Sequence, residues 1–277
     1  VFAIARAYSS INDHQKVLQT FDNDGDYWQE NGTYINSLCQ VSAPETCIES
    51  SEILLANSPQ EVSGYELKSS SEICLADFTG AEETLKTFER VLFSDPSDSG
   101  VLSVRAEQAL ATGRIDTFER YCRAALKRAE NGVFTEESLL VSKCDLDVAL
   151  TKNQFETAEV LLSELEATRE TSYDPYGFTT RKLEFEIILF ERGNSLANLE
   201  ELEIAFSNFQ QSNLIYKKRS PRSAELLEAK LKARYLLIKN EAGLAIKTLE
   251  RGGKYDFDPR TEAITWARAL SMQGDHQ

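Results

Sequence analysis

The sequence repeats one short pattern, a turn containing Asn or Gly that is followed by an apolar helical face. The segments "TGRIDTFERYC", "KNQFETAEVLL" and "KNEAGLAIKTL" align with Gly113, Asn153 and Asn240 at their second position, and "INDHQKVLQTF" fits the same pattern. Gly193 and Gly274 mark two further turns. Successive turns from Gly113 onward are 40, 40, 47 and 34 residues apart. Because Gly and Asn tolerate the left-handed conformation that ends a helix, this spacing constrains the chain to an array of helical pairs.

The fold class follows from this helical periodicity and from the absence of the alternating pattern that is typical of β-strands. No segment of useful length alternates apolar and polar residues, so the sequence predicts an all-α protein. Residues 22–72 depart from the regular pattern, and we interpret them as an irregular segment with room for one extra helical pair. In this segment Pro44 is placed to begin a helix and Pro59 to follow its end.

The arrangement of large and small residues around the turns resembles the tetratricopeptide repeat, a helix-turn-helix unit of about 34 residues. The residues that carry the resemblance are Ile4, Ala5, Tyr8, Ala158, Leu162, Ala229, Ala233, Leu236, Ala245, Leu249, Trp266, Ala267 and Leu270. Arg105 and Asp145 depart from it, because the family has a large apolar residue at these places. The resemblance implies a right-handed superhelix, or solenoid, of about six to seven helix-turn-helix repeats, with residues 1–277 forming a single repeat domain.

The resemblance also implies a binding surface, because tetratricopeptide-like domains bind ligands along the concave face formed by their first helices. The residues at matching positions are Ser103, Glu107, Lys143, Asp147, Lys230 and Arg234. The Lys/Asn clamp that cochaperone members use for a terminal carboxylate is absent here. We therefore expect a protein-interaction scaffold or adaptor that binds a peptide or a partner subunit, without a cofactor. The alternative is a sensor or regulatory effector-binding domain of a larger signalling protein or transcription activator.

The charge balance narrows the class of partner. With 30 basic and 45 acidic side chains the chain has a formal charge of −15, which disfavours nucleic acid and anionic membrane surfaces. No apolar run is long enough to insert into a bilayer. One dense basic run, Lys217, Lys218, Arg219 and Arg222, has two interpretations: favourable charge at a helix C-terminus, or a docking patch for an acidic partner.

Residues that could carry chemistry are sparse. The two histidines, His14 and His276, lie in a turn and at the chain end, which is poor material for a nucleophilic site. Asp22, Asp24 and Asp26 alternate as calcium ligands do, but the following residues do not match a calcium loop, so we interpret the stretch as a solvated loop. No Cys/His spacing matches zinc. The sequence therefore predicts neither an enzyme nor a metal site.

The five cysteines bear on the compartment in which the protein works. Cys39 and Cys47 flank a loop that a disulfide can close, whereas Cys122 and Cys144 lie among apolar neighbours and are interpreted as small core residues. We favour a cytoplasmic setting, and a bridge between Cys39 and Cys47 would instead imply a periplasmic or secreted protein. Both chain ends cut through repeat units, so we expect a piece of a longer chain.

Overall fold

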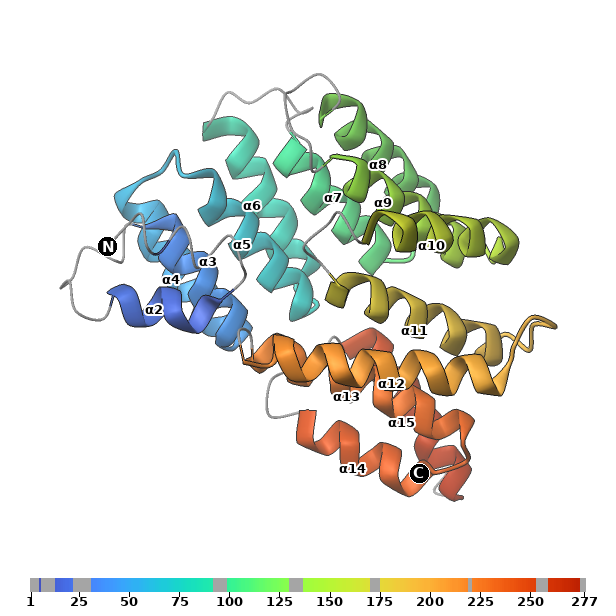
Figure 1. Ribbon diagram of the computed structural model, residues 1–277. Coiled ribbons are helices and arrows are strands. Elements are labelled where there is room, and N and C mark those ends of the chain that lie inside the picture. The colour runs from blue at the N-terminus through green and yellow to red at the C-terminus, as the bar shows by residue number, and fades with distance from the viewer. Residues whose placement is uncertain are drawn as a thin grey trace. The chain divides into compact units, whose positions relative to one another are not determined.

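The computed structural model describes residue 5 and residues 13–21, 31–91, 99–129, 137–169, 175–218, 221–252 and 259–274. Over these residues the chain forms 14 helices and no β-strand, which confirms the predicted all-α class (Figure 1). Packing divides the chain into two compact units, Val1–Thr151 and Lys152–Gln277, which we call the N-unit and the C-unit. The prediction of one continuous repeat domain concerns how these units join, and it stays a prediction.

The helices of both units pack in chain order, each against the next one. Those of the N-unit are α2 (His14–Phe21), α3 (Gly32–Val41), α4 (Pro44–Asn57), α5 (Val62–Cys74), α6 (Phe78–Val91), α7 (Ser99–Ala111), α8 (Ile115–Ala129) and α9 (Glu137–Thr151). Those of the C-unit are α10 (Phe155–Arg169), α11 (Pro175–Glu191), α12 (Leu199–Tyr216), α13 (Pro221–Ile238), α14 (Ala242–Gly252) and α15 (Pro259–Gln273). Alternate helices also touch, α3 with α5 and α7 with α5, then α11 with α13 and α13 with α15. This combination is compatible with a helical-repeat fold, in which each hairpin covers the apolar side of the next.

The turns that the sequence singled out have the predicted backbone conformation. Gly113, Asn153, Gly193, Asn240 and Gly274 all have positive φ, between 56° and 81°. At the first of these, the backbone N–H of Arg114 donates to the carbonyl of Ala109 at 2.8 Å, which is the closing bond of a helix C-terminal cap. The residue that repeats along the sequence is therefore the residue that ends a helix.

Ala76 adopts the same conformation without the residue type that normally supports it. Its φ is 60°, and the backbone N–H of Asp77 closes the cap on the carbonyl of Glu72 at 2.8 Å. A β-carbon disfavours left-handed backbone, so Ala76 is strained where Gly would not be. The sequence places a turn at Asp77, but alanine itself gives no signal for the positive φ at Ala76.

The strain at Ala76 leads to a paired prediction. We expect Ala76→Gly to raise the free energy of unfolding by about 0.5–1 kcal/mol, because it removes the left-handed penalty. Gly113→Ala should lower it by about 1 kcal/mol, since no atom lies within 4 Å of an added Cβ and backbone strain is the only new cost. Urea unfolding followed by circular dichroism measures both. Changes of the same sign would contradict the assignment of strain to these turns.

Residues 22–72 are more regular than the sequence analysis expected. From residue 31 onward the chain forms three helices, α3, α4 and α5, where we expected one irregular pair, whereas residues 22–30 lie outside the described part. Pro44 begins α4 and Pro59 follows its C-cap, as predicted. Ser37, Ser51 and Ser69 are completely buried between these helices. These polar residues at core positions interrupt the apolar pattern, which explains why the sequence looked irregular.

The core of the N-unit is built from aromatic and aliphatic side chains of successive helices. Tyr65 of α5 stacks on Phe88 of α6 with ring centroids 5.0 Å apart, and Leu85 and Val104 complete the cluster. A second cluster joins α7, α8 and α9. Cys122 is buried in this second cluster and Cys144 packs against it.

The core of the C-unit follows the same principle. Leu183, Phe209 and Leu231, from α11, α12 and α13, are buried in one cluster. Beside it, the rings of Phe206 and Tyr235 stack with centroids 4.1 Å apart. Another cluster joins α13, α14 and α15, with Trp266 half-buried against it. Each cluster therefore takes side chains from at least two successive helices.

One carboxylate is buried in the N-unit core with an unsatisfied oxygen. Glu72 of α5 is buried, and its Oε2 atom has no hydrogen-bond partner among the described residues. Its Oε1 atom is 3.9 Å from Nζ of Lys68. Burial raises the pKa of Glu72 above its ordinary value, while a hydrogen bond with Thr84 and the charge of Lys68 lower it. The raised pKa means that the ionised form of Glu72 weakens the fold.

We therefore expect Glu72→Gln to stabilise the protein at neutral pH by about 1 kcal/mol. The folded state holds the proton more tightly than the unfolded state, so wild-type stability falls as pH rises from 4.5, the ordinary value, through the raised folded pKa. The gain from Glu72→Gln should vanish below pH 4.5. Thermal unfolding across this range measures it, with exposed Glu49→Gln of α4 as control. A gain that does not depend on pH would contradict the assignment.

Candidate functional site

A cavity of about 480 Å³ lies between α6, α7 and α8 of the N-unit. Its volume is within the range of roughly 300–1,000 Å³ that is typical of ligand sites. The residues that line it are Phe78, Thr79, Glu82, Glu83, Lys86, Arg105, Gln108, Arg114 and Tyr121. We call this the α6–α8 cavity.

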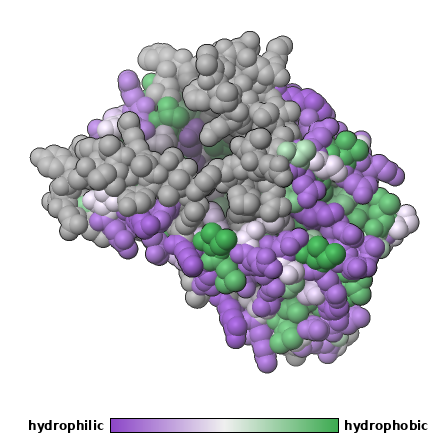
Figure 2. Space-filling model, viewed as in Figure 1, coloured by the Kyte–Doolittle hydropathy of each residue, from purple (hydrophilic) through white to green (hydrophobic). Residues whose placement is uncertain are grey.

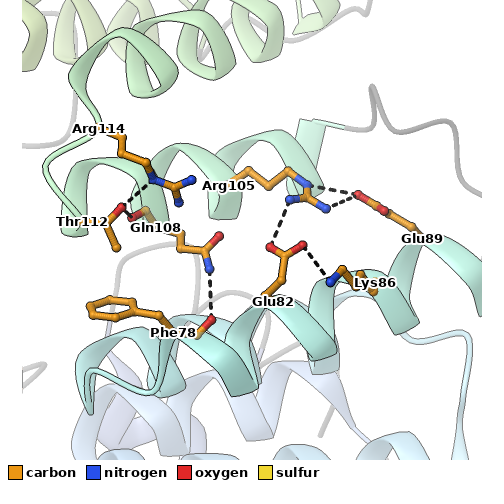
Figure 3. A network of polar contacts seen from close by, with 8 residues as sticks. All are labelled: Phe78, Glu82, Lys86, Glu89, Arg105, Gln108, Thr112 and Arg114. Carbon is orange, nitrogen blue, oxygen red and sulfur yellow. Dashed lines mark hydrogen bonds and ion pairs between the residues drawn. The ribbon is translucent and has the colours of Figure 1, made fainter.

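Arg105 crosses from α7 to α6 and fixes one wall of the α6–α8 cavity. Its Nε and Nη2 atoms donate to Oε1 of Glu89 at 3.1 and 2.7 Å, and its Nη1 atom donates to Oε2 of Glu82 at 3.3 Å (Figure 3). Lys86 Nζ lies 3.6 Å from the other oxygen of Glu82. Burial opposes the charge of Arg105, but Glu89 and Glu82 raise its pKa above the ordinary value. Arg105 thus links α7 to α6 through hydrogen-bonded ion pairs.

A second set of polar contacts positions Arg114 at the other end of the cavity. The side-chain amide of Gln108 donates to the carbonyl of Phe78 at 3.2 Å. Thr112 Oγ1 donates to the carbonyl of Gln108 at 2.8 Å and accepts from Nε of Arg114 at 2.9 Å (Figure 3). These contacts hold the guanidinium group of Arg114, through its Nε atom, at the turn between α7 and α8. Among the described residues, no carboxylate forms an ion pair with Arg114.

The α6–α8 cavity is lined both by Arg114, which has no ion pair among the described residues, and by two aromatic residues, Phe78 and Tyr121. Phe78 and Tyr121 are half-buried and offer apolar surface to the cavity. Arg114 is exposed and can form charge-assisted hydrogen bonds with a carboxylate. Chemically, the α6–α8 cavity suits an apolar side chain that is followed by an anionic group.

The sequence contained one signal for this site, the departure of Arg105 from the repeat pattern. Arg105 stands where an apolar residue was expected, and it pairs with carboxylates of the preceding helix α6. Asp145 of α9 is the second such departure, and it pairs in the same way with Arg123 of α8 at 3.5 Å. A charge at an apolar position of the pattern therefore marks an ion pair with the preceding helix. Arg114, Phe78 and Tyr121 carried no comparable signal.

Glu107 and Asp147, the predicted concave-face residues of the N-unit whose side chains are described, do not line the α6–α8 cavity. Glu107 is exposed on α7, and it accepts a hydrogen bond from Ser70 Oγ of α5 at 2.8 Å. Asp147 is half-buried on α9. The side chains of Ser103 and Lys143 lie outside the described part of the structure. The role of these four residues in binding stays a prediction.

The predicted residues of the C-unit belong to a ladder of charges on α11, α13 and α15. Arg234 donates to both oxygens of Glu191, with Nε to Oε1 at 3.1 Å and Nη2 to Oε2 at 2.6 Å. Arg268 Nη1 also donates to Oε1 of Glu191, at 3.0 Å. Only 9% of the Arg234 side chain is exposed, so its guanidinium is committed to Glu191. Arg234 is therefore a link between helices.

Lys230 lies one turn before Arg234 and acts on a different carboxylate. Burial disfavours ionisation of Glu184, but Arg181, Lys230 and Arg234 together hold its pKa below the ordinary value. Arg181 Nη1 lies 3.1 Å from Oε2 of Glu184. The basic residues predicted for ligand binding in this unit are thus already balanced by acidic residues of α11.

The structure describes only part of the basic run that follows α12. Lys217 forms an ion pair with Glu225 at 2.8 Å and, together with Lys232 and Arg251, lines a cavity of about 340 Å³ between α12, α13 and α14. Lys218 is exposed, whereas Arg219 and the side chain of Arg222 lie outside the described residues. Figure 2 shows small hydrophobic patches among mainly hydrophilic residues on the visible face. The docking patch stays a prediction.

The remaining predictions concern cysteines, metals and membranes. Cys39 and Cys47 join α3 to α4 with Cα atoms 4.8 Å apart, within the usual range for a disulfide. The loop with Asp22, Asp24 and Asp26 lies outside the described residues. Within the described ranges no group of three or more potential metal ligands occurs, and no helix is long and apolar enough to span a membrane.

Comparison with known proteins adds no further identification. The chain matches no protein-family model. No curated protein sequence matches it either. The candidate site therefore rests on its geometry alone.

Proposed function

We propose that the protein is an interaction scaffold of the tetratricopeptide-like class, in which the α6–α8 cavity binds a peptide segment of a partner protein. The observation that carries the proposal is the exposed Arg114, which Thr112 holds in a cavity that Phe78 and Tyr121 also line and which has no ion pair among the described residues. The segment we propose has an apolar side chain followed by a carboxylate. We assign no reaction and no cofactor to this site.

The superhelical part of the proposal is supported by contacts between alternate helices. In a stack of hairpins each first helix touches the first helix of the next pair, and α3, α5 and α7 do so in the N-unit. Such stacks leave long surfaces for recognition, since each repeat buries only the sides that face its neighbours. This supports binding as the function rather than a reaction.

The net charge of −15 does not prevent recognition of an anionic group at Arg114. At physiological ionic strength the Debye length is about 8 Å, so distant carboxylates of the protein are largely screened. Nearby, Glu82 is already paired with Arg105 and Lys86. Arg114 is the cavity cation without an ion pair among the described residues, and exposed Glu83 is the opposing charge on the cavity wall.

The cavity volume also favours a second candidate function, an effector-binding regulatory domain. A volume of about 480 Å³ suits a small anionic metabolite as well as the end of a peptide. The same Arg114 would bind such a ligand. The two candidates differ in the size of the ligand, which an experiment can distinguish.

Selection of a phage-displayed library of random peptides on the immobilised full chain tests the proposal. We expect peptides with an apolar residue next to an acidic one, and we expect Arg114→Glu to weaken their binding at least about tenfold, because a charge-assisted hydrogen bond contributes about 1.5–3 kcal/mol. Fluorescence anisotropy with labelled peptides measures the affinities.

Arg192→Glu is the matched control, because Arg192 is exposed at the turn between α11 and α12 of the C-unit. It makes the same charge change, and we expect the affinity to stay within about twofold. Peptide binding that Arg114→Glu leaves unchanged would refute the α6–α8 cavity as the site. Stabilisation by a small anion, lost in Arg114→Glu, together with no selected peptide would favour the effector-binding alternative.

A further inference from the structure

Cys122 and Cys144 occupy facing positions on the adjacent helices α8 and α9. Their Cα atoms are 6.2 Å apart, inside the range of about 4.4–6.8 Å that disulfides span. Cys122 is buried beside Phe118 and Val148, and Cys144 packs against the same cluster. The two helices therefore lie at a separation that a disulfide can span.

This pair is not isolated, because Cys39 and Cys47 have the same relation on α3 and α4. Their Cα atoms are 4.8 Å apart. Four of the five cysteines thus form two pairs, each joining consecutive helices, and all five lie in the N-unit whereas residues 152–277 contain none. The fifth, Cys74, is exposed at the end of α5 and belongs to neither pair.

Metal binding is the main alternative use of paired cysteines in a protein of this size. A tetrahedral zinc site needs four ligands, of which three or four come from the protein. Within the described ranges, neither cysteine pair belongs to a group of three potential ligands. Two thiolates alone would leave such a site incomplete, so the geometry favours a covalent link.

We infer that Cys122 and Cys144 form a disulfide which, together with the Cys39–Cys47 bridge, makes the N-unit a doubly cross-linked module. In each bond two thiols lose two protons and two electrons. The electrons reduce the disulfide of an exchange partner, a thiol–disulfide oxidoreductase or oxidised glutathione, to two thiols. Such bonds persist in oxidising compartments, so the N-unit matures in a periplasmic or extracellular setting. This inference replaces the cytoplasmic setting that the sequence analysis favoured.

The test is a thiol map of the full chain after refolding in a glutathione redox buffer. The protein is unfolded in guanidinium without reductant, alkylated with iodoacetamide, digested and analysed by mass spectrometry. We expect one alkylated cysteine, Cys74, out of five, and a pair of linked peptides that contain Cys122 and Cys144. Full alkylation of Cys122 and Cys144 would overturn the inference, whether or not Cys39 and Cys47 are linked.

Variants make the assignment specific to one bridge. In Cys122→Ala, alkylation of Cys144 should rise from near zero to one equivalent, while Cys39 and Cys47 stay protected. Cys74→Ser, which removes the thiol outside both pairs, should leave the linked peptides unchanged. Linkage of Cys144 to Cys74 in the wild type would overturn the inference. The wild-type map needs no variant to fold, so the result is decisive even if Cys122→Ala proves unstable.

Discussion

Phe88→Ala should be among the most destabilising single substitutions in the N-unit, with a loss of about 3–5 kcal/mol in the free energy of unfolding. The Phe88 side chain is completely buried on α6, stacks on Tyr65 of α5 and shares its cluster with Val104 of α7. Its removal leaves a cavity where three helices meet. The surrounding side chains come from different helices, so they cannot collapse into this cavity without moving a backbone.

Urea unfolding followed by far-ultraviolet circular dichroism measures the loss at Phe88. Phe88→Leu should cost less, because it retains part of the buried volume. Glu83→Ala, an exposed change on the same helix, should stay within about 0.5 kcal/mol of wild type. A loss below 1 kcal/mol for Phe88→Ala would contradict the packing of α5, α6 and α7 around this ring.

Phe209→Ala is expected to have a comparable effect on the C-unit, again about 3–5 kcal/mol. Phe209 is completely buried on α12, in a cluster with Leu183 of α11 and Leu231 of α13. It therefore fills the space between a hairpin and the first helix of the next pair. Its loss weakens both the hairpin and the stacking of the pairs.

Trp266 offers a probe that reports on the C-unit alone. It is half-buried against the cluster of α13, α14 and α15, and Trp28 is the only other tryptophan in the chain. In a Trp28→Phe background, fluorescence during urea unfolding follows Trp266. We expect Phe209→Ala to shift this transition to lower urea, whereas exposed Ser207→Ala should not. An unchanged transition would contradict the continuous packing from α11 to α15.

The turns were predictable from the sequence because their cause is local. Gly113, Asn153 and Asn240 have positive φ, which the residue type itself favours, so the pattern located the helix ends. Ala76 takes the same conformation although its residue type does not favour it, so the sequence located the turn but not the residue with positive φ. Helices α3 to α5 were harder to predict for a related reason. Buried polar residues such as Ser51 occupy core positions and so break the apolar periodicity from which helices are predicted.

The candidate site was harder to predict because it depends on which helices are neighbours. Arg105 was visible as an exception to the pattern, but its partners Glu82 and Glu89 are among many acidic residues. Only the register of α6 against α7 selects them. Arg234 is a similar case, because it was predicted to bind a ligand and nothing in the sequence indicated its bidentate contact with Glu191 of another helix.

A double-mutant cycle on Glu191 and Arg234 tests the stacking of helical pairs most directly. These residues are 43 positions apart, about one repeat, and their bidentate contact joins the first helices α11 and α13. The four proteins of the cycle should be compared in an Arg268→Ala background, which removes the other partner of Glu191. We predict a coupling free energy of at least about 1 kcal/mol. Effects of Glu191→Ala and Arg234→Ala that add within about 0.3 kcal/mol would show that α11 and α13 do not stack in this register.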